Sequence, residues 1–385
     1  MKQKLKTIVP TVIITFVLTL GAVFLAAWLI LGPDGISVTE SLALVNLRFV
    51  GEYKMSDVTH AAMDGMVKSL NDRWSYWLDS EGYHNQKENR SNSYVGIGVS
   101  VTYQEGKGLY IKSVAKGGPA EQAGLLAGET IQKAGGVSLA ELGQDKSYLL
   151  VKGEAGTSVD LEVSDAGGVI RTVTVMRAVV PSEPVSYKLL DNGVGLVTLK
   201  NFYDRSADKL KSAVGDLRSQ GATAIVFDLR NNPGGYLTEL QKMLDYLLPE
   251  GPVFRSRSRS GSEDVVESDA SCVKTPMAVL VNGDSYSAAE FFAAELREQG
   301  WAIVGGDVTC GKGYFQQTYP LLNGGSLSIS THTYYTGKGV SLIGTGITPD
   351  PLVKLTDEQS ALLIAGELAP ENDPQLQAVL ASLGF

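Results

Sequence analysis

An uninterrupted apolar segment near the N-terminus most strongly limits what this chain can fold into. No charged residue occurs from residue 7 to residue 33, and residues 8–31 are almost wholly apolar. At about 1.5 Å per residue, a helix of this length covers the roughly 30 Å hydrocarbon layer of a membrane. The segment therefore predicts a helix that spans a membrane once.

The residues before the apolar segment predict its orientation. Lys2, Lys4 and Lys6 precede it, and the positive-inside rule keeps such a tail in the cytoplasm. The alternative is a cleaved signal peptide, but the apolar core of a signal peptide has only about 7 to 15 residues. We expect residues 1–34 to form an uncleaved anchor of a single-pass cell-membrane protein, with the rest of the chain outside the cytoplasm.

The composition of the whole chain is typical of globular domains. Its 385 residues, 44% of them hydrophobic and 19% charged, are enough for two or three domains. The formal net charge of -9 argues against nucleic-acid binding, because no basic surface is available to displace counterions from phosphates. The sequence lacks an HExxH motif and clustered His and Cys ligands, so we expect no metal and no other cofactor.

The chain has two cysteines, Cys272 and Cys310. An exported domain could oxidise them to a disulfide, which would stiffen the turn that follows Cys310. The alternative is two unrelated buried thiols. The sequence leaves both possibilities open.

The sequence pattern changes twice after the anchor. Residues 35–91 carry apolar side chains at a spacing of three to four, which predicts a helical N-terminal region. Residues 92–179 contain short β-rich runs separated by glycine pairs, with two short helices expected at 119–128 and 141–153. This order of elements resembles a PDZ domain.

The glycine-rich run YVGIG suggests how such a domain would bind a ligand. Backbone N–H groups of Val95, Gly96, Ile97 and Gly98 could form a nest for the carboxylate at the end of a peptide. The strand that follows could then pair with the extended peptide as a new edge partner. The alternative is that the glycines only allow a tight turn.

Residues 180–385 alternate between strands and helices. Apolar strands are expected near residues 193–199, 224–230, 276–282 and 301–306, with helices between them and a final helix at 374–383. This pattern predicts a sheet covered by helices. The expected fold is thus a multidomain α+β and α/β protein.

Ser287 is the candidate nucleophile. A hydroxyl needs a neighbouring base to take its proton, but the three histidines, at 60, 84 and 332, do not lie in stretches typical of a nucleophile's surroundings. We expect Ser287 at the positively polarised start of a helix, where developing negative charge is favoured. Alternatively, Ser287 and Glu290 form an ordinary capping box, and Ser285 is a rival nucleophile inside the turn.

Lys312, which lies between Gly311 and Gly313, is the candidate base. To accept a proton it must be largely neutral, so its pKa must fall from about 10.4 to roughly 7 to 8 by removal from water. If residues 312–316 are extended, Gln316 lies on the same side as Lys312 and could orient its amine by accepting a hydrogen bond.

Two sources of backbone donors could form an oxyanion hole. One is the N–H of Ala288, next to the nucleophile, and the other is an N–H of Gly234 or Gly235 in the NNPGG turn. The alternative for this turn is a simple entry into the following helix. Local sequence does not decide between the two.

Several motifs together resemble one known family. These are FDLRNNPGG at 227–235, NGDSYSAAE at 282–290, GKGYFQ at 311–316, GTGITPD at 344–350 and DPQLQAVL at 373–380. From about residue 40 to its end, the chain resembles the C-terminal processing peptidases, also called tail-specific proteases. The resemblance implies a PDZ domain before a crotonase/ClpP-like protease core, and a serine endopeptidase that acts on proteins with exposed C-terminal tails.

The resemblance also implies site residues. It assigns the Ser/Lys dyad to Ser287 and Lys312 and the assisting glutamine to Gln316, and it implies that the protein could form a homo-oligomer and be gated by its PDZ domain. The chain departs from the family pattern at four positions, which leaves its substrate preference open. They are Asp284, Tyr286, Ala289 and Cys310.

Two other functions are compatible with parts of the sequence. A catalytically silent PDZ scaffold would keep the protease-like fold as a partner-binding domain, but it would not require Ser287, Lys312 and Gln316 together. A β-lactamase-like acylase would have lysine three residues after the serine, where this chain has Glu290. The sequence therefore favours the protease.

Overall fold

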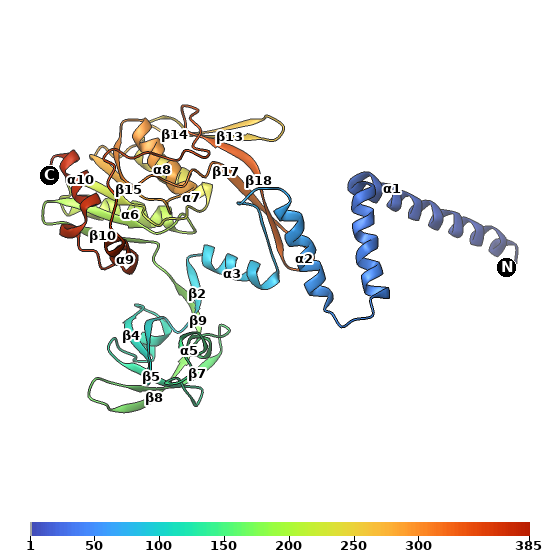
Figure 1. Ribbon diagram of the computed structural model, residues 1–385, viewed down its shortest axis with the longest axis horizontal. Coiled ribbons are helices and arrows are strands. Elements are labelled where there is room, and N and C mark those ends of the chain that lie inside the picture. Colours follow the sequence, from blue (N-terminus) through green and yellow to red (C-terminus); the bar gives the residue numbers. More distant parts are fainter. Residues whose placement is uncertain (1) are drawn as a thin grey trace. The chain divides into compact units, whose positions relative to one another are not determined.

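A computed structural model describes residues 2–385, with side-chain burial described from Val12 onward. The chain forms two compact units, Met1–Trp77 and Leu78–Phe385 (Figure 1). The second unit contains both the PDZ-like region and the protease-like core.

The first unit is helical. Helix α1 (Lys2–Arg48) consists of two helical pieces that meet at Gly32, whose φ of 66° and ψ of 178° are not helical. Among the described residues, one helix, Val12–Arg48, is long and apolar enough to cross a membrane, although a signal sequence has the same properties. Helix α2 (Met55–Lys68) follows, and the ring of His60 lies 4.7 Å from that of Trp77.

The PDZ-like region is an antiparallel sheet with two short helices. Its strand order is β3-β4-β5-β7-β8, with β6 beside β5. A separate hydrophobic core, which includes Leu109, Ile131 and Leu161, lies inside it. The elements are β3 (Val99–Gln104), β4 (Gly108–Val114), α4 (Pro119–Gln122), β5 (Thr130–Ala134), β6 (Val137–Ser138), α5 (Gln144–Val151), β7 (Ser158–Ser164) and β8 (Ile170–Met176).

A two-stranded ribbon connects this region to the core. Strands β2 (Ser93–Gly96) and β9 (Ala178–Pro181) pair in antiparallel fashion, so the chain leaves and re-enters the core at the same place. Helix α3 (Ser80–Arg90) precedes the ribbon, and the Asp79 side chain caps it by accepting from the N–H of Gly82.

The core contains a five-stranded sheet in the order β10-β11-β12-β15-β16. All neighbours are parallel except β10, which pairs antiparallel with β11 at one edge. Every residue of β12 and β15 is buried, as expected for parallel strands with both faces covered. The strands are β10 (Val185–Leu189), β11 (Val194–Leu199), β12 (Ala224–Asp228), β15 (Met277–Val281) and β16 (Ala302–Gly306).

Helices cover the two faces of this sheet. Alternate strand residues such as Ile225 and Phe227 pack with α6 (Ser206–Ser219), α7 (Leu237–Leu247) and α8 (Ala288–Glu298). Their neighbours Ala224 and Val226 point to the other face, where they pack with α10 (Pro374–Leu383). The core is therefore a three-layer α/β arrangement (Figure 1).

A second sheet brings further residues to the core. Strand β18 (Ser326–Tyr335) pairs antiparallel with both β17 (Tyr314–Pro320) and β13 (Gly251–Ser258), and β13 also pairs with β14 (Glu263–Ser268). The remaining elements are β1 (Tyr76–Leu78), α9 (Asp357–Ala365) and a short 3₁₀ turn (Pro370–Asn372).

The fold class predicted from the sequence is confirmed, and the final helix has the predicted bounds. The β13–β14 hairpin and α9 were not predicted, because the hairpin is rich in Ser and Arg and α9 has no fully buried residue. The helix expected over residues 119–128 is confined to α4.

Candidate active site

Two loops that follow parallel strands meet at one edge of the core sheet. The NNPGG turn follows β12, and the turn that leads to Ser287 follows β15. Asn282 joins the two loops, since its Oδ1 accepts from the N–H of Asn231 at 2.9 Å and its Nδ2 donates to the Asn231 side chain at 2.8 Å. Crevices at the carboxyl ends of parallel strands are where open α/β sheets bind ligands.

Ser287 lies at the N-terminal end of α8 in an unusual backbone conformation. Its φ of 58° is in the left-handed region that residues other than glycine rarely adopt, and the residue is 7% exposed. Its hydroxyl forms a hydrogen bond with the buried phenol of Tyr334 on β18. Burial raises the pKa of Tyr334 well above its usual range, while the bond that its oxygen accepts from the Ser287 hydroxyl opposes the shift.

Ser285, the rival nucleophile, is fully buried and has a structural role. Its hydroxyl donates to the carbonyl of Leu229 at 2.7 Å and accepts from the N–H of Asn282 at 2.9 Å. These bonds hold the turn after β15 against the end of β12. The position of Ser285 therefore favours Ser287 as the nucleophile.

Glu290 connects the Ser287 segment to the Lys312 segment. Its Oε2 accepts from the backbone N–H of Ser287 at 3.0 Å and from that of Lys312 at 2.9 Å. Its Oε1 accepts from the hydroxyl of Thr309 at 2.6 Å and from the N–H of Gly311 at 2.7 Å. The carboxylate half of the predicted capping box is thus present, and the same carboxylate also fixes the loop that carries the proposed base.

Glu290 is fully buried, which raises its pKa, while these hydrogen bonds oppose the shift. The sequence pattern around Glu290 predicts only a helix-capping role. A charged side chain in the otherwise apolar run AAEFFAA could have indicated a buried polar role. No comparable sequence signal marked Tyr334.

Lys312 is half-buried, and its Nζ lies 5.7 Å from the centre of the Tyr286 ring. The flanking glycines allow the loop to pack closely: a methyl group on Gly313 would lie 2.3 Å from Cγ1 of Ile343. Gly311 accepts a backbone hydrogen bond from Gly344 at 2.9 Å. The GKG motif is therefore packed against the GTGITPD motif.

Gln316 lies on β17, and its amide orientation is fixed by two bonds. Its Nε2 donates to the carbonyl of Tyr314 and to the hydroxyl of Ser330, each at 3.0 Å. Strand β17 begins only at Tyr314 and has a bulge between Phe315 and Gln316, so residues 312–316 do not form the continuous strand assumed in the sequence analysis.

The predicted oxyanion donors Gly234 and Ala288 lie next to Ser287, the candidate nucleophile. A methyl group on Gly234 would lie 2.8 Å from the N of Ala288 and 3.0 Å from Cβ of Ser287. The N–H of Gly234 already donates to Oδ1 of Asn232 at 2.8 Å. Within the described part of the chain, the N–H groups of Ala288 and Gly235 have no hydrogen-bond partner, so they are the donors best suited to a ligand oxygen.

The four residues of the predicted carboxylate nest lie partly in strand β2 and partly in the loop after it. Val95 and Gly96 belong to β2, and the N–H of Val95 donates to the Glu88 carboxylate at 2.7 Å. Ile97 and Gly98 follow β2, and among the described residues nothing accepts from their N–H groups. A role in carboxylate binding stays a prediction, for which Ile97 and Gly98 have the available donors.

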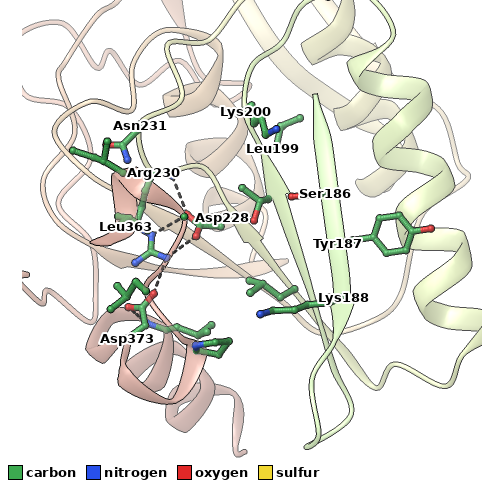
Figure 2. A pocket seen from close by; sticks show the side chains of 17 residues that line it. Ser186, Tyr187, Lys188, Leu199, Lys200, Asp228, Arg230, Asn231, Leu363 and Asp373 are labelled. Carbon is green, nitrogen blue, oxygen red and sulfur yellow. Dashed lines mark hydrogen bonds and ion pairs between the residues drawn. The ribbon is translucent and has the colours of Figure 1, made fainter. Parts of the chain in front are cut away.

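A buried ion-pair network centred on Arg230 lies at the start of the NNPGG turn. Figure 2 shows Arg230 between Asp228 and Asp373 in the wall of a cavity of about 550 Å³, with Nη2–carboxylate distances of 2.6 and 2.7 Å. Burial alone would lower the pKa of Arg230, but the two carboxylates raise it overall. Because Asp373 is the N-cap of α10, the network ties the end of β12 to that helix.

Among the residues that the structure describes, no group of three or more His, Cys, Asp or Glu side chains is arranged to hold a metal ion. Cys272 and Cys310 are separate, half-buried thiols.

Two regions of the chain match models of known protein families. The family model of peptidase family S41 matches residues 193–353, and that of the PDZ domain matches residues 85–164. A protein of Staphylococcus aureus (strain MRSA252) named "Probable CtpA-like serine protease" is 30% identical over 375 residues, which cover 94% of this chain and 74% of that protein. The chain belongs to peptidase family S41. The resemblance found in the sequence motifs is thereby confirmed.

Other S41 relatives are longer than this chain. Carboxy-terminal processing protease CtpA of Bacillus subtilis (strain 168) is 31% identical over 298 residues, which cover 77% of this chain. A CtpA-like relative in Staphylococcus haemolyticus (strain JCSC1435) is 33% identical over 311 residues, which cover 80% of this chain. The matched regions span 64% and 62% of the length of these two relatives.

Two solved structures share the S41 fold. The photosystem II D1 C-terminal processing protease aligns with a TM-score of 0.52 and 24% identity, covering 92% of this chain and 98% of that one. An S41-type protein of Bacteroides fragilis NCTC 9343 aligns with a TM-score of 0.54 and 19% identity, covering 83% and 90%. At these sequence identities, the structural similarity shows a shared fold alone.

Proposed function

We propose that this S41 chain is a serine endopeptidase anchored in the cell membrane by its N-terminal helix, with its PDZ domain and protease core outside the cytoplasm. In this proposal, the PDZ domain binds the C-terminus of a substrate protein and the Ser287/Lys312 dyad cleaves a nearby peptide bond. The proposal rests on one observation: the backbone N–H groups of Ser287 and Lys312 both donate to Oε2 of the buried Glu290.

The chemistry follows from this arrangement. The neutral amine of Lys312 takes the proton of the Ser287 hydroxyl as Oγ attacks the carbonyl carbon of the substrate. The N–H groups of Ala288 and Gly235 stabilise the oxyanion, and the protonated Lys312 then donates its proton to the departing amine. A water molecule then attacks the carbonyl carbon of the acyl-enzyme while Lys312 takes its proton. The acyl group leaves Ser287 as a carboxylic acid, and the proton returns from Lys312 to Oγ of Ser287.

Gln316 and Tyr334 have supporting roles in this proposal. Because the Nε2 of Gln316 is bonded to Tyr314 and Ser330, its Oε1 is the atom that can accept from the Lys312 amine. The phenol of Tyr334 holds the Ser287 hydroxyl in the resting enzyme. The hydroxyl must turn from Tyr334 to Lys312 before it reacts.

The PDZ assignment and the printed names of the relatives support the choice of substrate. A carboxy-terminal processing protease is among the relatives, and Ile97 and Gly98 have N–H groups available for a terminal carboxylate. We propose unfolded proteins with an apolar C-terminus as the substrate class. In this proposal the enzyme can also form a homo-oligomer.

The first prediction tests the dyad. Ser287→Ala and Lys312→Ala should each lower kcat/KM on an unstructured protein with an apolar C-terminus by at least about 100-fold, because each removes a group that acts in the transition state. Cleavage is measured by the appearance of new N-termini, and thermal unfolding checks that each variant is folded.

The controls for this prediction are Ser271→Ala and Lys274→Ala, which change exposed side chains of the same types. They should keep the parental rate. If the Ser287 and Lys312 variants cleave as fast as these controls, the dyad is wrong. If the parent binds tailed peptides but never cleaves them, the chain is a PDZ scaffold instead.

A further inference from the structure

The side chain of Asn92 forms an unusually dense set of hydrogen bonds. Its Nδ2 lies within hydrogen-bond distance of Oδ1 of Asn201 at 3.1 Å, the carbonyl of Asp204 at 2.8 Å and Oγ of Ser206 at 3.2 Å. Its Oδ1 accepts from Nδ2 of Asn201 at 2.9 Å. Asn92 is 3% exposed, and it has a left-handed φ of 48°.

These bonds lie where the PDZ-bearing ribbon joins the core. Asn92 immediately precedes β2, and its carbonyl accepts from the N–H of Ser182, which follows β9, at 2.8 Å. Arg205 donates to the carbonyls of both residues, at 2.5 and 3.2 Å. Asn92 therefore ties both ends of the ribbon to one segment of the core, residues 201–206.

The same segment, residues 201–206, is hydrogen-bonded to the NNPGG turn and to the residue after it. The N–H of Phe202 donates to the carbonyl of Gly234 at 2.8 Å, and the carbonyl of Phe202 accepts from the N–H of Tyr236 at 2.6 Å. A methyl group on Gly235 would lie 2.3 Å from the oxygen of Phe202. A displacement of Phe202 would therefore displace the peptide that carries the N–H of Gly235.

We propose that Asn92 is a positioning residue for the reaction, which sets the location of the Gly235 oxyanion donor through residues 201–206. This inference rests on the proposed function, since it assumes that Gly235 stabilises an oxyanion. A donor that is misplaced by about 1 Å loses much of its effect on the transition state while ground-state binding is retained.

The chemistry of the amide makes asparagine necessary at this position. Oδ1 of Asn201 also accepts from the N–H of Tyr203 at 3.0 Å and from the Ser206 hydroxyl at 3.1 Å, so the Asn201 amide cannot turn over to offer a donor instead. A carboxylate at position 92 would place an oxygen against acceptors on Asn201 and Asp204. Asparagine also tolerates the left-handed φ.

The test compares Asn92→Gly, which keeps the left-handed backbone but removes the side chain, with Asn92→Asp, which keeps the shape but removes the donor. The control is Asn71→Gly, because Asn71 has a similar φ of 51° and is exposed. The measurements are kcat and KM on a tailed peptide, the Kd of a peptide boronate that mimics the tetrahedral oxyanion, and circular dichroism to confirm folding.

Both Asn92 variants should lower kcat by about 10- to 100-fold and weaken boronate binding by a similar factor, with KM and the binding of an uncleaved tailed peptide within about twofold of the parent. Asn71→Gly should match the parent in each measurement. If kcat falls without a matching loss of boronate affinity, or if folded Asn92 variants keep the parental kcat, the assignment is overturned.

Failure of this inference is distinguishable from failure of the proposed function. The parent and Ser287→Ala are measured beside the Asn92 variants. A parent that cleaves only when Ser287 is present, together with Asn92 variants of unchanged kcat, refutes the role of Asn92 alone. A parent whose cleavage does not depend on Ser287 refutes both.

Discussion

At the scale of single residues, one buried carboxylate determines how the two proposed catalytic residues lie. Glu290 accepts four hydrogen bonds, all from groups in the Ser287 and Lys312 segments. Because each of its oxygens faces two donors, an amide in its place would put an NH₂ group against donors in either orientation. A carboxylate is therefore the only side chain of this shape that satisfies the site.

The second prediction follows for Glu290→Gln. We expect kcat/KM to fall by about 100-fold and the free energy of unfolding to fall by roughly 1–3 kcal/mol, since at least one buried donor loses its acceptor. Urea unfolding and cleavage assays measure the two effects. The exposed Glu358→Gln should change neither, and a Glu290→Gln enzyme with parental activity would contradict the role given to the carboxylate.

The third prediction concerns Glu295, also on α8. Burial raises its pKa to about 8, although the hydrogen bond from the N–H of Gly337 and the charge of Lys338 oppose the shift and Glu298 adds to it. A carboxyl group whose pKa is higher in the folded state stabilises the fold in its protonated form. This contribution is fully present below about pH 4.5 and is lost as the pH rises through about 8.

We therefore expect the urea midpoint of the parent to decrease between pH 6 and pH 9. Glu295→Gln keeps the neutral shape and should decrease less over the same range. Equal pH dependence in the two proteins would show that Glu295 does not titrate as described.

The proposed catalytic residues could be predicted from the sequence, but the residues that hold them in place could not. Ser287, Lys312 and Gln316 lie in recognisable motifs, so the sequence alone predicts them. Glu290 was identified only as a helix cap, because a local pattern cannot show that a carboxylate also reaches a loop about twenty residues away. Tyr334 comes from the separate β17–β18 sheet, and only tertiary packing brings it to Ser287.

At the scale of elements, the NNPGG turn and the start of α8 are packed too closely for side chains on the turn. Gly234 has a φ of 81°, and an added methyl group would lie 2.7 Å from the carbonyl oxygen of Tyr286. Close approach of the two backbones is what places the turn beside Ser287.

The fourth prediction tests this close approach with Gly234→Ala. We expect it to abolish measurable cleavage and to lower the melting temperature by several degrees, because it adds a clash to the strain of a left-handed alanine. Gly221→Ala is the matched control, since Gly221 has a φ of 91° and open space around its Cβ position. The control should lose about 1 kcal/mol of stability and keep its activity, and equal behaviour of the two variants would refute the packing argument.

Elements were predictable where local signals and packing agree. Strands β12 and β15 are continuous apolar runs, and α10 has Asp373 as its cap and Pro374 at its first position. The β13–β14 hairpin alternates arginine and serine, and the partly buried Arg255 pairs with Glu263 at 3.0 Å, which no local pattern indicates. The bulge in β17 depends on pairing with β18 and was likewise invisible in the sequence.

At the scale of the whole molecule, the chain combines an apolar N-terminal helix with two separately packed domains. The hydrophobic core of the PDZ domain and that of the protease core share no residue. In the described part of the chain, the apolar helix has exposed side chains such as Ile30, at 81%. A helix of this kind is stable in a membrane rather than in water.

The fifth prediction separates an anchor from a signal sequence. If the helix is retained, the protein extracted from membranes should have an intact mass that includes residues 1–33, and alkaline carbonate should not release it. A version that lacks residues 1–48 should remain in the supernatant and cleave the soluble peptide at the parental rate. A mature protein that begins near residue 34 and washes off the membrane would contradict the anchor.

The closure of the β2–β9 ribbon has a consequence for how such enzymes could diversify. Since the chain departs after Asn92 and returns at Ser182 with a 2.8 Å bond between them, the intervening domain behaves as a cassette whose two ends are already joined. Replacing it with another peptide-binding domain would require no change in the fold of the protease core. Under the proposed function, such an exchange would change which C-termini are recognised and leave the residues proposed for cleavage in place.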